Sequence, residues 1–432
     1  MLGIEFNLGK AQEDKVQNLA CYINEKALEE SHKEMDRNKA KGSDGVSKDE
    51  YAVNLKANLE ELIQDMKSGR YKPNASRRTY IPKDGSNKMR PLGISCYKDK
   101  LVENVIAKIL TMVYEPKFYG ESYGFRPGRN CHQAVREVIE DVQFRRTNYV
   151  VEADIKGFFD NVDHEWMMKF LEHDIADKKF LELIKKFLKA GIMEDGKLLE
   201  SEKGTPQGNG ASPLLANIYL HYVLDTWFVK QVKKHCKGEA YLIRYCDDFV
   251  CCFQYKEDAE KFYQDLIERF RKFKLELALE KTKILEFGRF AKHNRAMRWL
   301  GKPETFDFLG FTFYCSENGK KEFFRCKVKT SKKKFRVKVK TMKEWIKKNR
   351  TLKLSELMKK INQKLTGYYR YYGVTDNMRE VKNYRNAVVW LLYKWLNRRS
   401  QRRSFNLETF FKGLLKSLPI VEPKIYVNLF YR

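Results

Sequence analysis

The sequence predicts an α+β fold in which helices pack on an antiparallel sheet and a helical part follows at the C-terminal end. Three observations lead to this prediction. Apolar runs that end at turn residues, at 149–154 and 241–253, are typical of strands. The segment 97–118 carries apolar residues at helical spacing. Residues 343–395 are helical and basic throughout, so we expect them to form a separate helical region.

Composition restricts the class of partner. The 432 residues include 85 Lys and Arg against 57 Asp and Glu, and this net charge of +28 predicts a polyanionic partner, most simply nucleic acid. A basic membrane-surface protein is the competing interpretation, although no apolar run is long enough to span a bilayer, and we expect no membrane partner. The nine scattered Cys contain no CxxC pair, which argues against a zinc ribbon or disulfide framework and favours a reducing compartment.

The first part of the chain is charged and helical. Residues 51–68 predict a helix with one buried face, since apolar residues recur at helical spacing from Leu55 to Met66. The loop 38–46 before this helix is rich in Gly, Ser and Asp. Its lysines, Lys41 among them, are candidates for phosphate contacts, and a solvated loop explains the same composition equally well.

Two basic segments, 77–83 and 89–94, flank a Gly/Asn turn and predict a β-hairpin. Arg77, Lys83 and Arg90 lie on its arms and could converge on one anionic ligand. A guanidinium fork together with an ammonium group suits a triphosphate. From these residues alone, an exposed basic hairpin is the simpler alternative.

A helix that begins at residue 97 and ends near Tyr114 leads into a shaped loop. Gly and Pro residues mark 121–129 as this loop, and we expect its Arg126 and Arg129 to face an anion. A second helix is expected over 131–143.

The apolar strand 149–154 ends at Asp154, a position from which a carboxylate can reach a shared site. Asp160 and Asp163 are alternatives for that role, although Asp163 is better placed to cap the helix that follows.

The loop 203–213 contains three glycines, which allow the backbone to approach a ligand closely. Gln207 within it could hydrogen bond to a nucleotide. A lead-in to the apolar helix 214–224 explains this composition about as well.

Two adjacent carboxylates, Asp247 and Asp248, lie in the turn between the apolar segments 241–243 and 249–253. Like charges this close resist being ionised together. Mg²⁺ removes the conflict, because it prefers hard oxygen ligands and is often held by one or two carboxylates. A solvated Asp-Asp turn is the alternative.

The rest of the chain is mostly helical and basic. We expect a helix over 257–273, a strand with a Gly kink over 306–313, and a strand or extended segment with one basic face over 332–340. The tyrosines of 361–372 and the cationic tract 398–403 could bind nucleic acid, since aromatic rings stack on bases while cations hold phosphates. Packing of some tyrosines in a helical core is equally expected.

Together these motifs resemble the reverse transcriptases encoded by bacterial group II introns, the intron maturases. Residues 245–248 resemble the Tyr-x-Asp-Asp box, with Cys246 in place of the usual Ala. Residues 153–160 are similar to the first catalytic motif, 308–311 to the primer grip, and 361–372 to the maturase thumb.

The resemblance implies functional residues. The catalytic residues and ligands of two Mg²⁺ ions, which Mn²⁺ could replace, are Asp154, Asp247 and Asp248, with Ile155 as a further metal ligand. The nucleotide pocket comprises Arg77, Lys83, Arg90, Phe158, Phe159, Gln207, Gly208 and Lys281, with Phe159 favoured over Phe158 as the sugar gate. Template and primer contacts are Lys41, Arg126, Arg129, Leu309 and Gly310. RNA contacts of the thumb are Lys364, Tyr368, Arg370, Arg398, Arg399, Arg402 and Arg403.

The resemblance also implies a right-hand polymerase with an N-terminal extension, fingers, palm and helical thumb, which we place at 1–75, 76–145, 146–320 and 321–432. The implied function is RNA-directed DNA synthesis on intron RNA for retrohoming, with assistance to splicing in the bacterial cytoplasm. Implied partners are intron RNA, a DNA primer or target, and deoxynucleoside triphosphates; monomer and homodimer stay open.

Two alternatives share these features. One is a domesticated relative in phage defence, CRISPR spacer acquisition or DNA repair, and the other is a non-catalytic RNA-binding splicing factor. No paired Cys or clustered His indicates an HNH endonuclease, so we expect no cleavage of target DNA by the protein itself.

Overall fold

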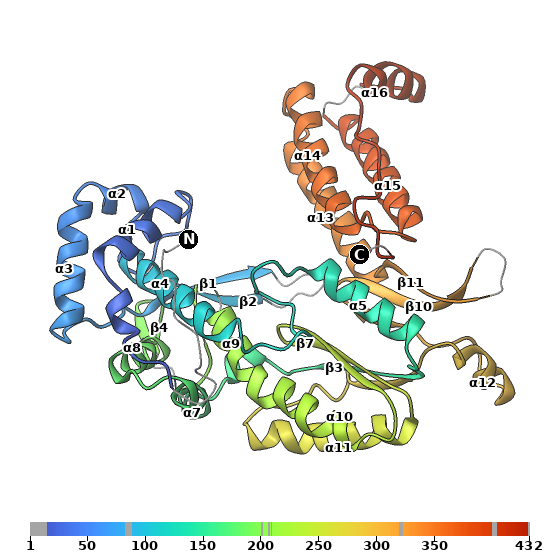
Figure 1. Cartoon of the computed structure of the whole chain (residues 1–432). Coiled ribbons are helices and arrows are strands. Elements are labelled where there is room, and N and C mark those ends of the chain that lie inside the picture. The colour runs from blue at the N-terminus through green and yellow to red at the C-terminus, as the bar shows by residue number, and fades with distance from the viewer. Residues whose placement is uncertain are drawn as a thin grey trace.

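The computed structural model describes residues 15–82, 89–199, 202–205, 208, 210–318, 323–399 and 404–430. Helices of the N-terminal part lie at one end of the molecule, a sheet lies in the centre, and the C-terminal helices stand above the other end (Figure 1). Within the described ranges, no helix combines the length and apolar character that crossing a membrane requires.

A four-stranded antiparallel sheet forms the centre. Its order is β6-β7-β3-β8, with bounds Ala240–Tyr245 (β6), Asp248–Phe253 (β7), Tyr149–Asp154 (β3) and Lys283–Glu286 (β8). Successive residues of β7 face opposite sides, since Phe249 joins one apolar cluster and Val250 joins the other. Both faces are therefore covered, one by α11 (Lys256–Lys272) and the other by α5 (Cys131–Phe144).

A second sheet lies at the N-terminal end, in the order β2-β1-β4-β5. Its strands are β1 (Ser76–Pro82), β2 (Met89–Ile94), β4 (Ile192–Glu194) and β5 (Lys197–Leu199). Antiparallel pairing of β1 with β2 confirms the predicted basic hairpin. The helices of this part are α1 (Glu25–Glu34), α2 (Lys48–Ala52), α3 (Leu55–Lys67), α4 (Tyr97–Tyr114), α7 (His164–Asp174) and α8 (Lys178–Leu188), besides the short η1 (Ala20–Tyr22) and α6 (Phe158–Asn161).

One helix differs from the prediction. The expected helix over 51–68 is two helices, because Val53 and Asn54 separate α2 from α3. The helix expected to begin at 97 and to end near Tyr114 is α4, which ends at Tyr114 as predicted.

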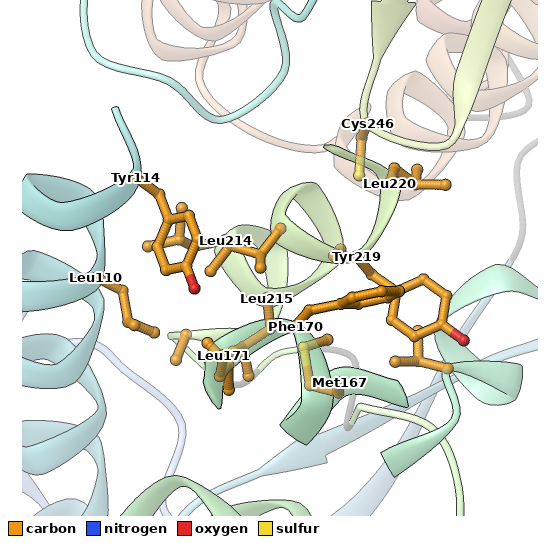
Figure 2. Packing of buried hydrophobic residues seen from close by; sticks show 14 of the residues in the cluster. Leu110, Tyr114, Met167, Phe170, Leu171, Leu214, Leu215, Tyr219, Leu220 and Cys246 are labelled. Carbon is orange, nitrogen blue, oxygen red and sulfur yellow. The ribbon is translucent and has the colours of Figure 1, made fainter. Parts of the chain in front are cut away.

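One long helical stretch replaces the predicted helix 214–224. It begins as α9 (Ser212–Leu220) and continues through the π-helical segments η2 (His221–Asp225) and η3 (Phe228–Val232) into α10 (Lys233–His235). Figure 2 shows side chains of α9, including Leu214, Leu215 and Tyr219, packed with those of α4 and α7 in one apolar cluster.

The C-terminal lobe spans residues 331–430, and its described residues, 331–399 and 404–430, are mostly helical. Its elements are α13 (Lys332–Asn349), α14 (Leu354–Tyr372), α15 (Met378–Leu396), η4 (Thr409–Leu414) and α16 (Leu415–Ser417). A three-stranded sheet of β9 (Phe306–Phe308), β10 (Phe311–Glu317) and β11 (Phe324–Thr330) connects this lobe to the central sheet, and α12 (Ala291–Met297) precedes it.

The expectation of an extended strand over 332–340 is wrong, because these residues open α13. Alternating Lys and apolar residues mimic a strand over nine positions, but the longer spacing is helical. Phe335, Val339, Met342 and Ile346 pack into the apolar cluster of the C-terminal lobe at intervals of four, three and four residues. Lysine also has a high helix propensity.

The expected kinked strand over 306–313 is instead a tight hairpin of β9 and β10. Phe308 pairs with Phe311, so Leu309 and Gly310 form a two-residue turn. Both have positive φ, +49° and +80°, which is the requirement of a type I′ turn.

The Ile346→Ala variant tests the buried face of α13. Ile346 is 0% exposed, so we expect its truncation to lower the free energy of unfolding of the C-terminal lobe by about 2–5 kcal/mol. Lys340→Ala on the exposed side should change it by less than about 0.5 kcal/mol. Amide hydrogen exchange in α13 and α15 measures both, and equal losses would contradict the assigned face.

Candidate active site

The acidic turn connects β6 to β7. Tyr245 pairs with Asp248, so Cys246 and Asp247 form a two-residue turn, which confirms the predicted strand–turn–strand pattern. Cys246 has a φ of +58°, a conformation that two-residue hairpin turns require and that a non-glycine residue resists. Its side chain is buried in the apolar cluster, where Figure 2 shows it near Leu220. The core thus anchors the turn, while Asp248 lines an open cleft.

A third carboxylate reaches the turn from β3. Asp154 is the last residue of that strand and pairs directly with Asp248 of β7. Residues paired in this way have Cα atoms about 4.5–5.5 Å apart. Three carboxylates, those of Asp154, Asp247 and Asp248, therefore lie at one end of the central sheet.

The backbone of Ile155 also faces this end. On one side of Ile155 the carbonyl of Asp154 accepts a hydrogen bond from Ala278 N, and on the other Lys156 N donates to the carbonyl of Glu276, both at 2.8 Å. Both bonds lie on the side of this segment that is opposite β7. In an extended chain the backbone N–H and C=O groups of successive residues point to opposite sides. The N–H and C=O groups of Ile155, which lies between Asp154 and Lys156, therefore point toward β7.

Burial, and to a lesser extent neighbouring negative charge, raises the pKa values of the carboxylates at this end of the sheet. Desolvation and the neighbouring charge of Asp247 raise the pKa of Asp248 to about 7. Desolvation and Asp154 also raise the pKa of Asp247, and the charge of Arg90 opposes this rise. Burial raises the pKa of Glu152, two residues before Asp154, to about 7. Because the folded chain then holds a proton on Asp248 that the unfolded chain has released, the contribution of Asp248 to stability falls as the pH rises from 3.8 toward about 7.

A cation would relieve this repulsion, and the chain supplies one such charge. The Lys281 ammonium forms an ion pair with Asp154, and that hydrogen bond raises the pKa of Lys281. Carboxylate oxygens are the ligands that Mg²⁺ prefers, so the donor chemistry fits a divalent cation. Within the described ranges, however, no three His, Cys, Asp or Glu side chains are gathered into a ready-made metal cage.

A buried ion pair lies directly under the turn. Arg244 and Asp225 are both 0% exposed and share two hydrogen bonds, Nε to Oδ1 at 2.7 Å and Nη2 to Oδ2 at 2.6 Å. Arg244 also donates to the Cys246 carbonyl at 3.0 Å, Asn217 Oδ1 at 2.9 Å and Ser122 Oγ at 2.8 Å. These bonds use all five guanidinium N–H groups.

Gly124 touches the turn from the other side. A Cβ atom added at Gly124 would lie 2.5 Å from Cys246 N, so only glycine fits. Its carbonyl accepts a hydrogen bond of 2.6 Å from Asn217 Nδ2. Asn217 therefore connects the Arg244 guanidinium to the loop 121–129.

The cations expected to contact template and primer have other partners. Arg126 has only 4% side-chain exposure and forms an ion pair with Glu115 at 2.8 Å. The expectation that Arg126 contacts a nucleic acid is therefore wrong, because its guanidinium is buried and paired within the protein. Arg129 is half-buried and donates to a backbone carbonyl at 2.7 Å. Lys41 is exposed and pairs with Glu50 at 2.9 Å.

The basic hairpin approaches the acidic turn. Arg90 on β2 is exposed and close enough to lower the pKa of Asp247. Arg77 on β1 is half-buried and donates to the Lys41 carbonyl at 2.8 and 3.1 Å, which joins the hairpin to the N-terminal loop. Lys83 lies outside the described residues.

The glycine-rich loop reaches the same hairpin. A Cβ atom at Gly208 would lie 2.9 Å from the Gly93 carbonyl oxygen of β2, while Gln207 lies outside the described residues. Of the two candidate gate residues, Phe158 is 2% exposed in the core, and Phe159 is half-buried.

An open cleft of about 640 Å³ extends from Asp248 to the C-terminal lobe. Leu309 and Gly310 line it, and the Leu309 backbone hydrogen bonds to Asp248. The Leu309 carbonyl accepts a hydrogen bond of 2.8 Å from Tyr371 Oη in α14. Lys364 of the same helix is exposed at the cleft wall.

The other expected RNA contacts of the C-terminal lobe differ in exposure. Tyr368 is 7% exposed and stacks on a second tyrosine, so most of it is core, although its edge lines the cleft. Arg370 and Arg398 are exposed. Arg399 is half-buried and donates to a backbone carbonyl at 3.0 Å. Outside the described residues lie Arg402 and Arg403.

Comparison with known proteins agrees with this arrangement. Residues 81–313, more than half of the chain, match the reverse transcriptase (RNA-dependent DNA polymerase) family. The chain belongs to the reverse transcriptase family. Residues 332–411, which cover most of the C-terminal lobe, match the group II intron maturase-specific domain. Together the two matches confirm the α+β right-hand polymerase class with a helical C-terminal part.

Curated relatives align over part of their length. The group II intron-encoded protein LtrA of Lactococcus lactis subsp. cremoris is 44% identical over 196 residues, which are 45% of this chain and 32% of that protein. Protein YkfC of Escherichia coli (strain K12) is 38% identical over 183 residues, 42% of this chain and 48% of its own length. The alignments thus span 32% and 48% of the length of these relatives. A telomerase structure from Candida albicans aligns with a TM-score of 0.46 at 12% identity over 84% of this chain and 66% of its own, too distant to carry an argument.

The sequence interpretation missed the support under the turn. Arg244 lies three residues before Asp247, and Asp225 interrupts a largely apolar helical stretch. A lone charge in such a stretch is a signal, since fully buried charged residues are rare unless paired.

The Asp225→Asn variant tests the buried pair. It leaves the Arg244 charge buried without a counter-charge, and we expect it to lower the free energy of unfolding by about 3–5 kcal/mol. Glu276→Gln breaks the exposed pair with Lys156 and should cost less than about 1 kcal/mol. Chemical denaturation of both variants measures the difference; similar values would show that the buried pair has no special role.

Proposed function

We propose that the protein is an RNA-directed DNA polymerase of a group II intron, which copies intron RNA into DNA for retrohoming and binds that RNA to assist splicing. The observation that carries the proposal is the register of the central sheet, which pairs Asp154 with Asp248 beside Asp247. Family membership and the maturase-specific match support it. We place this activity in the bacterial cytoplasm.

The three carboxylates and the Ile155 carbonyl would hold two Mg²⁺ ions, which Mn²⁺ could replace. Bound there, the ions supply charge that activates a primer 3′-hydroxyl and neutralises a departing pyrophosphate. The raised pKa values of Asp247 and Asp248 support this assignment, because a divalent cation displaces the retained protons.

The residues around the carboxylates would position the incoming deoxynucleotide. Phosphoryl transfer depends mainly on positioning and charge neutralisation. Arg77, Lys83, Arg90 and Lys281 are assigned to the triphosphate, and Gln207 and Gly208 to the pocket wall. Lys281 would exchange its Asp154 partner for phosphate oxygens when the nucleotide enters. The half-buried Phe159 is assigned to exclude a ribose 2′-hydroxyl, while Phe158 supports it from the core.

The cleft between Asp248 and the C-terminal lobe would hold the primer paired to its RNA template. Leu309 and Gly310 are placed at the primer terminus, with Lys41 and Arg129 along the template. The RNA-binding face of the thumb comprises Lys364, Arg370, Arg398, Arg399, Arg402 and Arg403. In this proposal the fingers are 76–145, the palm 146–320 and the thumb 321–432, after an N-terminal extension of 1–75.

Primer extension on an RNA template tests the activity. With Mg²⁺ and deoxynucleotides the wild-type protein should extend a DNA primer, and Asp248→Asn should lower the rate on the order of a thousandfold or more, because it removes a proposed cation ligand. The same substitution removes a negative charge from a crowded site, so the unliganded variant should be no less stable than wild type at pH 8. Undiminished synthesis by the double variant Asp247→Ala, Asp248→Ala would refute the assignment.

Sugar selection is a separate test. Phe159→Ala should allow incorporation of ribonucleotides by opening space next to the sugar, measured as the ratio of kcat/KM for ribo- and deoxynucleotides. A decrease in discrimination of about 10–100-fold is expected for one displaced steric contact. If Phe158→Ala relaxes selection instead, the gate has been assigned to the wrong phenylalanine.

A further inference from the structure

A second groove lies away from the acidic turn. It has a volume of about 1400 Å³ and is bordered by α12, the β10–β11 hairpin and the end of α5, which lie together at one edge of the molecule (Figure 1). The chain enters it from Glu286 of β8, which pairs with Tyr149 of β3. Asp154 is five residues further along β3, roughly 17 Å away at about 3.4 Å per residue. The groove is therefore separate from the reaction centre.

The lining of this groove is basic and aromatic. Its cations are Arg289, Lys292, Lys302, Arg325 and Lys329. Among the described lining residues, Glu317 is the single carboxylate. Three phenylalanines at its margin are more exposed than such side chains usually are, at 66%, 54% and 67%: Phe144, Phe290 and Phe323. A surface with these properties is complementary to a polyanion that carries flat apolar groups.

Trp299 directly precedes the lining residue Leu300 and has an unfavourable backbone conformation. It is 97% exposed and has a φ of +55°. Trp299 N donates to the Ala296 carbonyl at 3.1 Å and Leu300 N to the Arg295 carbonyl at 2.9 Å, so α12 ends in a Schellman motif with tryptophan at the left-handed position. Glycine normally occupies this position, and a bulky residue there is a strained outlier. Neither packing nor helix capping accounts for the indole.

Ion pairs hold the basic segment in place. Arg295 pairs with Glu304 at 3.4 Å, and Arg298 pairs with Glu286 of β8. The second pair joins the end of α12 to the central sheet, and the first joins α12 to the segment that follows it. Arg289 and the exposed Lys302 are then the cations of this segment best placed for an external anion.

We propose that this groove binds an unpaired segment of the intron RNA, with a base stacked on Trp299 and phosphates held by Arg289 and Lys302. Proteins recognise unpaired bases by stacking them on aromatic side chains while cations follow the backbone. Double-stranded RNA is contacted mainly at its phosphates and 2′-hydroxyls and offers no free base to an exposed indole. The excess of cations favours RNA over a protein partner. That the bound RNA is the intron rests on the proposed function. That the groove binds unpaired RNA rests only on its own residues.

The experiment first saturates the catalytic cleft with a template–primer hybrid, so that a second RNA can bind only elsewhere. The full-length protein is bound to an excess of an RNA-template–DNA-primer hybrid, and a fluorescent oligouridine of about 12 nucleotides is then titrated in. We expect saturable binding that Trp299→Gly weakens about five- to a hundredfold, the range for loss of one stacked base, and that Trp299→Phe largely retains. Glycine suits the left-handed position, so thermal stability should not fall. Extension of the bound hybrid should be unchanged, because the groove is remote from the carboxylates.

Charge is tested in parallel. Lys302→Gln should lower the salt dependence of oligouridine binding by about one phosphate contact, and Lys178→Gln, an exposed lysine of α8, should leave it unchanged. Equal binding by wild type and Trp299→Gly would overturn the proposal, as would equally effective competition by blunt duplex RNA. A change of oligomeric state in Trp299→Gly without loss of RNA binding would assign the surface to protein and also overturn it. Failure of the wild type to extend the hybrid would refute the polymerase function but not this site.

Discussion

The position of the acidic turn depends on one buried guanidinium. Arg244 bonds to segments that are distant in sequence: Ser122 in a loop, Asn217 in α9, Asp225 in η2 and Cys246 in the turn itself. Burying an ion pair contributes little net stability, because desolvation offsets most of the attraction. Its contribution here is geometric, since a planar donor with five fixed N–H directions allows one arrangement of its acceptors. The backbone of the turn is therefore fixed independently of the carboxylates it carries.

This separation matters because the carboxylates repel one another. Burial raises the pKa values of Asp247, Asp248 and Glu152, and the neighbouring carboxylates raise them further. A turn held only by its own side chains would relax by moving them apart. In this protein the Arg244 guanidinium holds the backbone of the turn, and Lys281 and Arg90 place positive charge near the carboxylates.

Much of the fold follows from local sequence, and what does not follow has identifiable reasons. Strand β3, the acidic turn and α11 were predicted because apolar periodicity and turn residues agree over each segment. The segment 332–340 was misassigned because nine residues of alternating Lys and apolar residues fit both periods, and only the positions up to Ile346 decide between them. The sequence predicts a kinked strand instead of a hairpin at Leu309, because a non-glycine residue occupies a position that requires positive φ.

In the candidate site, too, some residues were predictable from local sequence and others were not. The carboxylates of Asp154 and Asp248 were predicted as partners from strand ends, and the register pairs them. Residues whose role depends on long-range packing were missed or misplaced: Arg126 looks like a nucleic-acid contact in sequence but is buried against Glu115, and the partners of Arg244 have no common motif. A periodic pattern of apolar residues indicates which face of an element is buried, but it does not indicate which polar atoms meet on that face.

Leu309, in the turn between β9 and β10, contacts both the central sheet and the C-terminal lobe. Its backbone hydrogen bonds to Asp248 in the central sheet, and its carbonyl accepts from Tyr371 in the helical lobe. Hydrogen bonding by Leu309 lowers the pKa of Asp248, against the larger effect of desolvation. Loss of this hydrogen bond would raise the pKa of Asp248 further. A carboxylate of the central sheet and a tyrosine of α14 thus share one backbone residue, so a shift of α14 that moved Leu309 would also change how readily Asp248 loses its proton.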